Sequence, residues 1–506
     1  MISAGKKYLF GADFGTSGVK AVLLDPGTGK LWASDMFCYE MKHKYPLWAE
    51  QTPGDWIAAL AEALKQVLGK AEAAPEDILA IAFSTFGCTT VCVDENDEAI
   101  GDAMTWMDGR TGEEVAWLNQ NMADEISKVN GNVISTLPTT ANFLWLREKD
   151  KERYGKAKKF GGVLTYLDLK TSGSFVVPPS EATFIHVFDL KTSEYSAPLA
   201  EKLGIPLEKL AAIVPSTNHI GTVTAEAARA IGFAEGTPVI AGAQDNAAAS
   251  LGMGVYKAGQ VFFSMGTAGN MGLIIDELKQ DSTLMTQAFL FPDTWIMLAT
   301  MGNNGACIKW FNNNIASPIA GADIGYEGLD LLAEKSRPGN TGVIFLPYLS
   351  GELSPVWDEK ARACFIGMTS RTDAGDLVRS VLEGVCFAIK HNLLMYERAG
   401  CHIGDSIKIA GGPTNSRLWM QILADVTGKE IMIPDVTDAG PLGDAMLAGI
   451  ANGSFSSPEE AVERCVRTKR SYEPDTSAKP VYDELFGIYL DLGEKNMEAF
   501  RRLEKY

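Results

Sequence analysis

The sequence lacks the residue patterns of a metal cluster or a disulfide framework. Its eight cysteines and five histidines are dispersed over 506 residues, with no CxxC pair and no HExxH motif. Zinc sites need closely spaced thiolate and imidazole ligands, so this dispersal excludes the common zinc motifs. Cys88 and Cys92 lie four residues apart in an apolar run, and we expect them to be core thiols in a reducing compartment.

Long apolar runs and basic tracts are missing too. No run approaches the roughly 18 residues that a membrane-spanning helix requires. The few apolar residues before Asp13 leave no room for a signal peptide, so we expect a cytoplasmic protein with no membrane partner. The formal net charge is −19 and no basic segment is present to neutralise phosphates. This balance argues against a nucleic-acid partner.

The remaining composition is that of an ordinary soluble globular protein, with 46% hydrophobic and 22% charged residues. The length exceeds what one hydrophobic core accommodates, and it predicts two large domains or a few smaller ones. An anionic substrate such as ATP would then be held by local donors and a metal ion, because the overall charge repels it.

One stretch carries the clearest chemical signal: residues 13–18, Asp-Phe-Gly-Thr-Ser-Gly. Apolar, partly β-branched runs at 8–12 and 19–24 flank it and predict two strands joined by a tight turn. The glycines allow the N–H groups of the turn to approach a ligand closely. An ordinary glycine-rich hairpin is the alternative interpretation.

The polar residues of this turn favour phosphate and metal chemistry. Thr16 and Ser17 add hydroxyl donors, and Asp13 supplies a carboxylate that suits a hydrated Mg²⁺ ion. A Walker phosphate loop is excluded, because Lys20 is misplaced for it and no helix follows.

The same pattern recurs in the second half of the chain. Residues 261–275 contain a β-rich run, a Gly-Thr-Ala-Gly turn and a second β-rich run. Duplication of a phosphate-binding hairpin implies two related domains that face each other. We place the boundary between Gly252 and Gly259, which predicts an N-terminal domain of residues 1–254 and a C-terminal domain of residues 255–506.

A candidate base follows another predicted strand. The run at 239–242 leads into Asp245 and Asn246 and then into a helix of small residues at 247–251. A carboxylate after a strand can accept a proton from a bound alcohol. The alternative is that Asp245 only caps the helix.

With these features placed, the chain resembles the FGGY carbohydrate kinase family over nearly its whole length. The second signature of the family is present at 363–368, 376–377 and 380–383, a run that also has the apolar spacing of a core helix. The first signature, at 140–148, is weaker, because Asn142 stands where the family has a lysine.

The resemblance implies an α/β fold of two duplicated actin-like (ribonuclease H-like) domains flanking an ATP cleft. It also implies transfer of the ATP γ-phosphoryl group to a sugar or polyol hydroxyl. Such a transfer needs positioning, charge neutralisation and a base. Asp245 matches the catalytic aspartate of the family, and Asp13 matches the aspartate associated with Mg²⁺, whose water shell Asp245 also contacts in this interpretation.

The resemblance further assigns two sets of binding residues. The ATP set is Thr16, Ser17, Lys20, Gly266, Thr267, Gly305, Lys309, Gly411, Gly412 and Asn415. The acceptor set is Phe86, Gly87, Cys88, Trp106, Asp108, Arg110, Asp245 and Asn246. Two alternatives stay open, namely that Lys20 is a solvated strand lysine and that Trp106 is a core aromatic.

The acceptor is predicted to be a ketopentose such as xylulose or ribulose. The loop at 85–88 lacks both the Met-His-Gly run of D-xylulose kinases and the Arg-Glu pair of glycerol kinases. Kinases for glycerol, erythritol or gluconate are therefore alternatives. A non-catalytic actin-like nucleotide switch is an alternative from a different class, and it would need no base beside a sugar-sized pocket. A homodimer is compatible with the resemblance, although no residue pattern indicates one.

Overall fold

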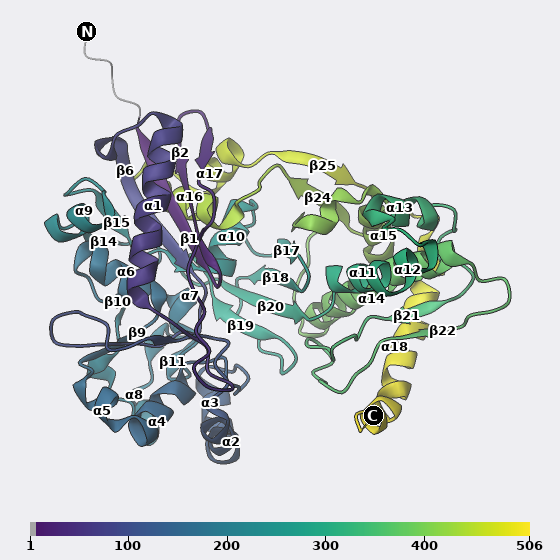
Figure 1. Cartoon of the computed structure of the whole chain (residues 1–506), viewed down its shortest axis with the longest axis horizontal. Helices are drawn as coiled ribbons and strands as arrows, with labels where there is room; N and C mark the ends of the chain where they lie inside the picture. Colours follow the sequence, from purple (N-terminus) through teal and green to yellow (C-terminus); the bar gives the residue numbers. More distant parts are fainter. Residues whose placement is uncertain (1–6, 506) are drawn as a thin grey trace, which may run out of the picture.

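The computed structural model describes residues 7–505, which form two lobes with a large sheet in each (Figure 1). At the centre of the first sheet lies the predicted first hairpin, in which β1 (Tyr8–Gly15) and β2 (Gly18–Leu24) pair antiparallel. β6 (Ile78–Thr85) runs parallel to β1 on its other side. These strands are buried along almost their whole length, which explains their continuous apolar runs.

The second sheet repeats this arrangement. β17 (Val261–Met265) and β18 (Gly269–Ile275) form an antiparallel hairpin, and β23 (Ser406–Ala410) runs parallel beside β17. β20 (Trp295–Met301) flanks β18 as β3 (Leu31–Ala33) flanks β2. The predicted α/β class and the predicted duplication are thus both confirmed.

The other strands of the two sheets lie outside these central strands. They are β4 (Phe37–Cys38), β14 (His219–Thr222), β15 (Pro238–Ile240) and β16 (Ala243–Gln244) in the first lobe, and β19 (Met285–Ala288), β24 (Glu430–Pro434) and β25 (Thr468–Tyr472) in the second.

Helices cover both sheets. Those that pack on the sheets or carry predicted residues are α1 (Pro53–Ala71), α4 (Thr140–Lys149), α6 (Val163–Ser172), α7 (Pro179–Ala182), α10 (Asp245–Gly252), α11 (Gly305–Phe311), α13 (Gly325–Ala333), α14 (Ala374–Arg398), α15 (Arg417–Thr427), α16 (Ala439–Ala451) and α18 (Lys479–Leu503).

One helix from late in the chain packs on the first sheet. α16 lies against β1 and β6 and against α10, in an apolar cluster with residues from both lobes. Glycines allow the helices to meet backbone to backbone. A Cβ at Gly443 would lie 1.9 Å from the carbonyl oxygen of Ala248, and a Cβ at Gly252 would lie 1.9 Å from that of Ala439. Because α10 begins at Asp245, this contact fixes the position of the candidate base.

The second signature forms the expected core helix. α14 begins with a capping box in which Asp373 and Asp376 bond each other's backbone N–H groups. Val381, Leu382 and Val385 are buried in the core of the second lobe.

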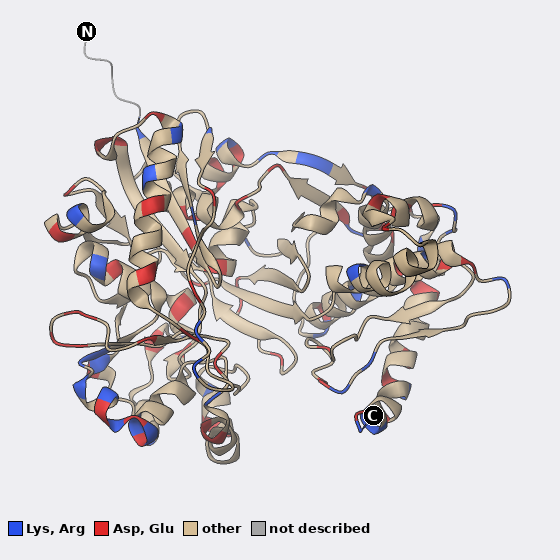
Figure 2. Cartoon of the chain, in the orientation of Figure 1, with Lys and Arg blue, Asp and Glu red and all other residues tan. Residues whose placement is uncertain are grey.

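All eight cysteines are free, and Cys88 and Cys92 are buried as expected. Figure 2 shows lysines and arginines interspersed with acids over both lobes. Within residues 7–505, every helix is too short or too polar to span a bilayer.

Candidate active site

Asp13 lies at the centre of the first sheet, between two strands. In the strand register it faces Lys20 on β2 and Ser84 on β6. The hydroxyl of Ser84 lies 3.0 Å from Oδ1 of Asp13. Burial raises the pKa of Asp13 to about 6, and the Ser84 hydrogen bond and the charge of Lys20 oppose this shift. Asp13 is therefore a carboxylate held in place by its own sheet.

Side chains from outside the hairpin hold the turn after Asp13 by hydrogen bonds. The amide of Gln51 donates to the carbonyl of Thr16 at 2.8 Å, and the indole N–H of Trp106 donates to the Thr16 hydroxyl at 2.9 Å. Ser17 is left exposed at the tip. Trp106 is 38% exposed, so it is no core aromatic, and its hydrogen bond to Thr16 joins the predicted acceptor set to the predicted phosphate turn.

Lys20 makes a contact that sequence reasoning missed. Its ammonium lies 2.7 Å from Oδ1 of Asp438, the residue just before α16. Behind it, a Cβ at Gly440 would lie 2.6 Å from Oδ2 of Asp13, so the first turn of α16 closes on that carboxylate. Lys20 is thus an ion-paired residue between two segments distant in sequence, and its contact with ATP stays a prediction.

Asp245 is the first residue of α10, and its neighbours hold only one of its oxygens. The cap bond of α10 belongs to Gln244, whose side chain accepts from the Asn246 N–H at 2.9 Å. Oδ1 of Asp245 accepts from the same N–H at 2.5 Å, from the Asn246 amide at 2.9 Å and from the Gln244 amide. Burial, and next the charge of Asp13, raise the pKa of Asp245 to about 7. A carboxyl with a pKa near neutrality suits general-base work.

Asp108 and Arg110 bind each other beside Trp106. The guanidinium of Arg110 lies 2.8 Å and 2.5 Å from the two oxygens of Asp108, and 2.8 Å from Glu50. It also stacks 3.4 Å from the ring centre of Trp48. Because both charges are buried and paired, the pair fixes the loop that carries Trp106. A direct contact of either residue with an acceptor stays a prediction.

The predicted acceptor loop packs inward. Phe86 and Cys88 are buried, and Cys88 adopts a positive φ of 60°. A side chain at position 87 would clash, because a Cβ there would lie 2.6 Å from the ring of Phe184. Burial raises the pKa of the Cys88 thiol, which excludes it as a thiolate nucleophile at neutral pH.

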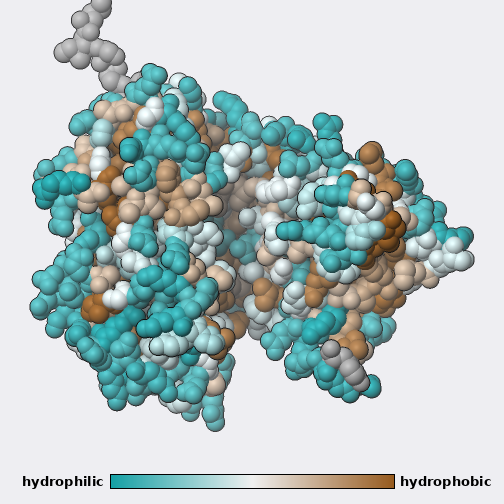
Figure 3. Space-filling model, viewed as in Figure 1, coloured by the Kyte–Doolittle hydropathy of each residue, from teal (hydrophilic) through white to brown (hydrophobic). Residues whose placement is uncertain are grey.

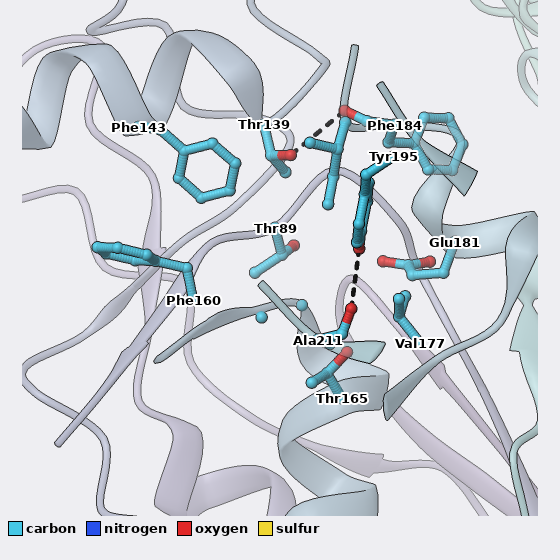
Figure 4. Close-up of a pocket in the computed structure, with 13 residues that line it drawn as sticks. Thr89, Thr139, Phe143, Phe160, Thr165, Val177, Glu181, Phe184, Tyr195 and Ala211 are labelled. Atoms are coloured by element: carbon cyan, nitrogen blue, oxygen red, sulfur yellow. Dashed lines mark hydrogen bonds between the residues drawn. The ribbon is translucent and has the colours of Figure 1, made fainter. Parts of the chain in front are cut away.

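A small cavity of about 20 Å³ lies behind this loop, lined by Thr89, Thr165, Glu181 and Tyr195 among others (Figure 4). The Tyr195 hydroxyl donates to the carbonyl of Ala211. Oε2 of Glu181 and the Thr165 hydroxyl are buried without a hydrogen-bond partner. Burial, with the charge of Asp245 as a further cause, raises the pKa of Glu181 well above its usual range. A space of this size is large enough for one water molecule.

The second lobe contains a cavity of about 520 Å³, a size suited to a nucleoside. Part of the predicted ATP set lines it, together with residues that the sequence analysis did not single out. The predicted residues are Gly266, Thr267, Gly305, Lys309, Gly412 and Asn415, and the others include Tyr326, Asp330 and Trp419.

Gly411 has a different role from Gly412. Its φ is 119°, and a Cβ there would lie 2.0 Å from the carbonyl oxygen of Met265, so it permits the turn against the second hairpin. Gly412 meets nothing within 4 Å and leaves a flat open surface in the cavity. Gly411 therefore permits the backbone turn, and Gly412 leaves space for a planar ring.

Asp13 and Asp245 are suitable ligands for a hydrated Mg²⁺ ion. Magnesium is usually bound by one or two carboxylates together with water and substrate phosphates. Within residues 7–505 no three His, Cys, Asp or Glu side chains gather as an all-protein metal site. The charge of Asp13 is, after burial, a cause that raises the pKa of Asp245.

Two buried residues beside Asp13 were missed by the sequence analysis. Ser84 is the next-to-last residue of β6, and Asp444 stands alone as a charged residue in the apolar helix α16. Asp444 could have been singled out from the sequence as an isolated charge in an apolar helix, because fully buried carboxylates are rare unless they have a partner.

The comparisons with known proteins agree with this geometry. The N-terminal domain model of the FGGY family of carbohydrate kinases matches residues 8–252, and the C-terminal domain model matches residues 261–452. The chain is 26% identical to the xylulose kinase of Bacillus subtilis over 494 residues, with 96% of each protein covered. It is 26% identical to the gluconokinase of the same species over 507 residues, covering 99% of this chain and 98% of that protein.

Among solved structures, a xylulose kinase from Rhodospirillum rubrum has a TM-score of 0.90 at 26% identity, covering 98% of this chain and 100% of that one. The fold and the two family models define a carbohydrate kinase with two duplicated domains. This chain belongs to the FGGY family of carbohydrate kinases. It is therefore a phosphotransferase with an alcohol group as acceptor, and the family implies ATP as its phosphoryl donor.

Proposed function

We propose that the protein transfers the γ-phosphoryl group of ATP to a hydroxyl of an uncharged ketopentose such as xylulose or ribulose. The charge of the acceptor set supports this choice. Its only cation is Arg110, which is committed to Asp108 and Glu50. The carboxyl group of Asp245 lies in the same set, so a carboxylate-bearing acceptor such as gluconate would meet repulsion without a counter-charge.

In the proposed mechanism, the acceptor and the triphosphate meet between the lobes, where Figure 3 shows a deep groove. Asp245 accepts the proton of the acceptor hydroxyl as that oxygen attacks the γ-phosphorus and the bond to the ADP oxygen breaks. Thr16 and Ser17 bind the phosphates from one lobe, and Gly266 and Thr267 bind them from the other. Asp13 and Asp245 would hold a Mg²⁺ ion, which when bound would supply positive charge to neutralise the phosphates. Closure of the groove excludes water and limits ATP hydrolysis.

A panel of acceptors tests the proposed substrate class. ADP release would be measured with D-xylulose, D- and L-ribulose, glycerol, erythritol and gluconate, with an acceptor-free control. We expect kcat/KM for a ketopentose to exceed that for gluconate by at least about tenfold, a difference of one ~1.4 kcal/mol step. Turnover with gluconate alone would overturn the ketopentose assignment but leave the kinase intact. ADP release that no acceptor stimulates would favour the nucleotide switch.

A further inference from the structure

Asp444 is a fully buried carboxyl group that has no role in the proposed mechanism. It lies on α16 with 0% of its surface exposed, and its Oδ1 has no hydrogen-bond partner. Its Oδ2 lies 2.7 Å from the hydroxyl oxygen of Ser84. The same hydroxyl oxygen lies 3.0 Å from Oδ1 of Asp13. Ser84 thus joins two carboxyl groups, one from each half of the chain.

The number of protons decides the direction of these hydrogen bonds. The Ser84 hydroxyl has one proton and can donate it to only one of the two carboxyl oxygens. At the second contact, the carboxyl group must donate its own proton to the Ser84 oxygen. Two oxygens 2.7–3.0 Å apart with no proton between them would repel each other. One of the two acids must therefore supply a proton.

The surroundings identify Asp444 as the donor. Asp13 is opposite Lys20 in the strand register and lies against the first turn of α16, and both favour its ionised form, although Lys20 is also paired with Asp438. Asp444 is fully buried on the apolar helix α16 and its Oδ1 has no hydrogen-bond partner, so its ionised form would be a buried charge with one oxygen unpaired. Burial, and next the charge of Asp13, raise the pKa of Asp444 well above its usual range, against the hydrogen bonds from Ser84. Of the two carboxyl groups, Asp444 is therefore the one that keeps its proton.

We propose that Asp444 is a positioning residue, which donates a hydrogen bond to Ser84 and thereby directs the Ser84 proton onto Asp13. Oδ1 of Asp13 is then held by Ser84, while its Oδ2 is confined by the backbone at Gly440. The carboxylate consequently has one orientation before nucleotide binds. For the role of Asp13 in catalysis, the proposal rests on the function proposed above; the hydrogen-bond direction is independent of it.

Kinetics of a variant series test the positioning role. In Asp444→Asn the amide still donates to Ser84, so we expect kcat within about threefold of the parent. Asp444→Ala and Ser84→Ala should each lower kcat by roughly tenfold or more, as expected for loss of a hydrogen bond to a charged group, with acceptor KM unchanged. The double variant Asp444→Ala/Ser84→Ala should be no slower than Ser84→Ala alone. Both substitutions break the same hydrogen-bond chain from Asp444 through Ser84 to Asp13.

Asp168 provides the matched control. It is equally buried, and both of its carboxyl oxygens lack a partner, but it lies on α6 and no hydrogen bond links it to Asp13. Asp168→Asn should leave kcat unchanged. An Asp444→Asn variant as slow as Asp444→Ala would overturn the donor role, and so would full activity of Asp444→Ala or strictly additive losses.

Infrared difference spectroscopy of the nucleotide-free full chain tests the proton itself, even if the alanine variants fail to fold. The spectrum of the parent minus that of Asp444→Asn should show the carbonyl band of a protonated carboxylic acid. Ionised carboxylate bands in its place would overturn the proposal without bearing on whether the protein is a ketopentose kinase. A protonated band together with no activity toward any ketopentose would overturn the proposed function alone.

Discussion

Replacement of Asp245 by alanine is expected to lower kcat by about 10²- to 10⁴-fold, the usual contribution of a positioned general base. Nucleotide affinity should change little, because the lining of the 520 Å³ cavity does not include Asp245. Steady-state kinetics with a ketopentose, together with calorimetric titration of ADP, would measure the two effects separately.

Ser250→Ala is the control for this substitution. Ser250 lies on the same helix, is buried, and its hydroxyl donates to the carbonyl of Ala247 within that helix. We expect it to retain kcat with a modest loss of stability. Full activity of Asp245→Ala would exclude Asp245 as the base, and a parallel loss of ADP binding would indicate a collapsed site instead of a missing proton acceptor.

Gly443→Val is expected to destabilise the protein more than a typical core substitution. A Cβ at this position would lie 1.9 Å from the carbonyl oxygen of Ala248, and backbone atoms of two packed helices cannot move away cheaply. We expect a loss of at least about 3 kcal/mol, which corresponds to a melting temperature lower by roughly 3–6 °C for a chain or lobe of this size. Thermal unfolding monitored by circular dichroism measures this shift.

Gly487→Ala is the matched control, because Gly487 lies inside α18 and meets nothing within 4 Å. A helical alanine there should stabilise the protein by about 0.5–1 kcal/mol. If Gly443→Val melted at the parent temperature, the close contact of α10 with α16 would be wrong. The mutual placement of Asp245 and Asp13 would then lose its structural basis.

The local pattern of the sequence was sufficient to predict both hairpins. Apolar runs on either side of a Gly-Thr-containing turn identified β1 with β2 and β17 with β18, because strand pairing across a tight turn is a local property. The same is true of α14, whose apolar spacing and capping residues are contiguous.

Contacts between distant segments could not be predicted in this way. Ser84 and Asp444 are 360 positions apart, and only the packing of α16 on the first sheet brings them together. Sequence spacing also gave no sign that Asp108 and Arg110 neutralise each other, since whether two charges pair or face a ligand depends on the side chains packed around them.

The most direct measurement of the central claim is a phosphorus NMR time course of the full chain with ATP, Mg²⁺ and a ketopentose. We predict that ADP and a sugar monophosphate form in equal amounts, and that both products disappear in the Asp245→Ala variant. Release of inorganic phosphate without a sugar phosphate, or ATP that stays intact with each ketopentose, would contradict the proposed reaction.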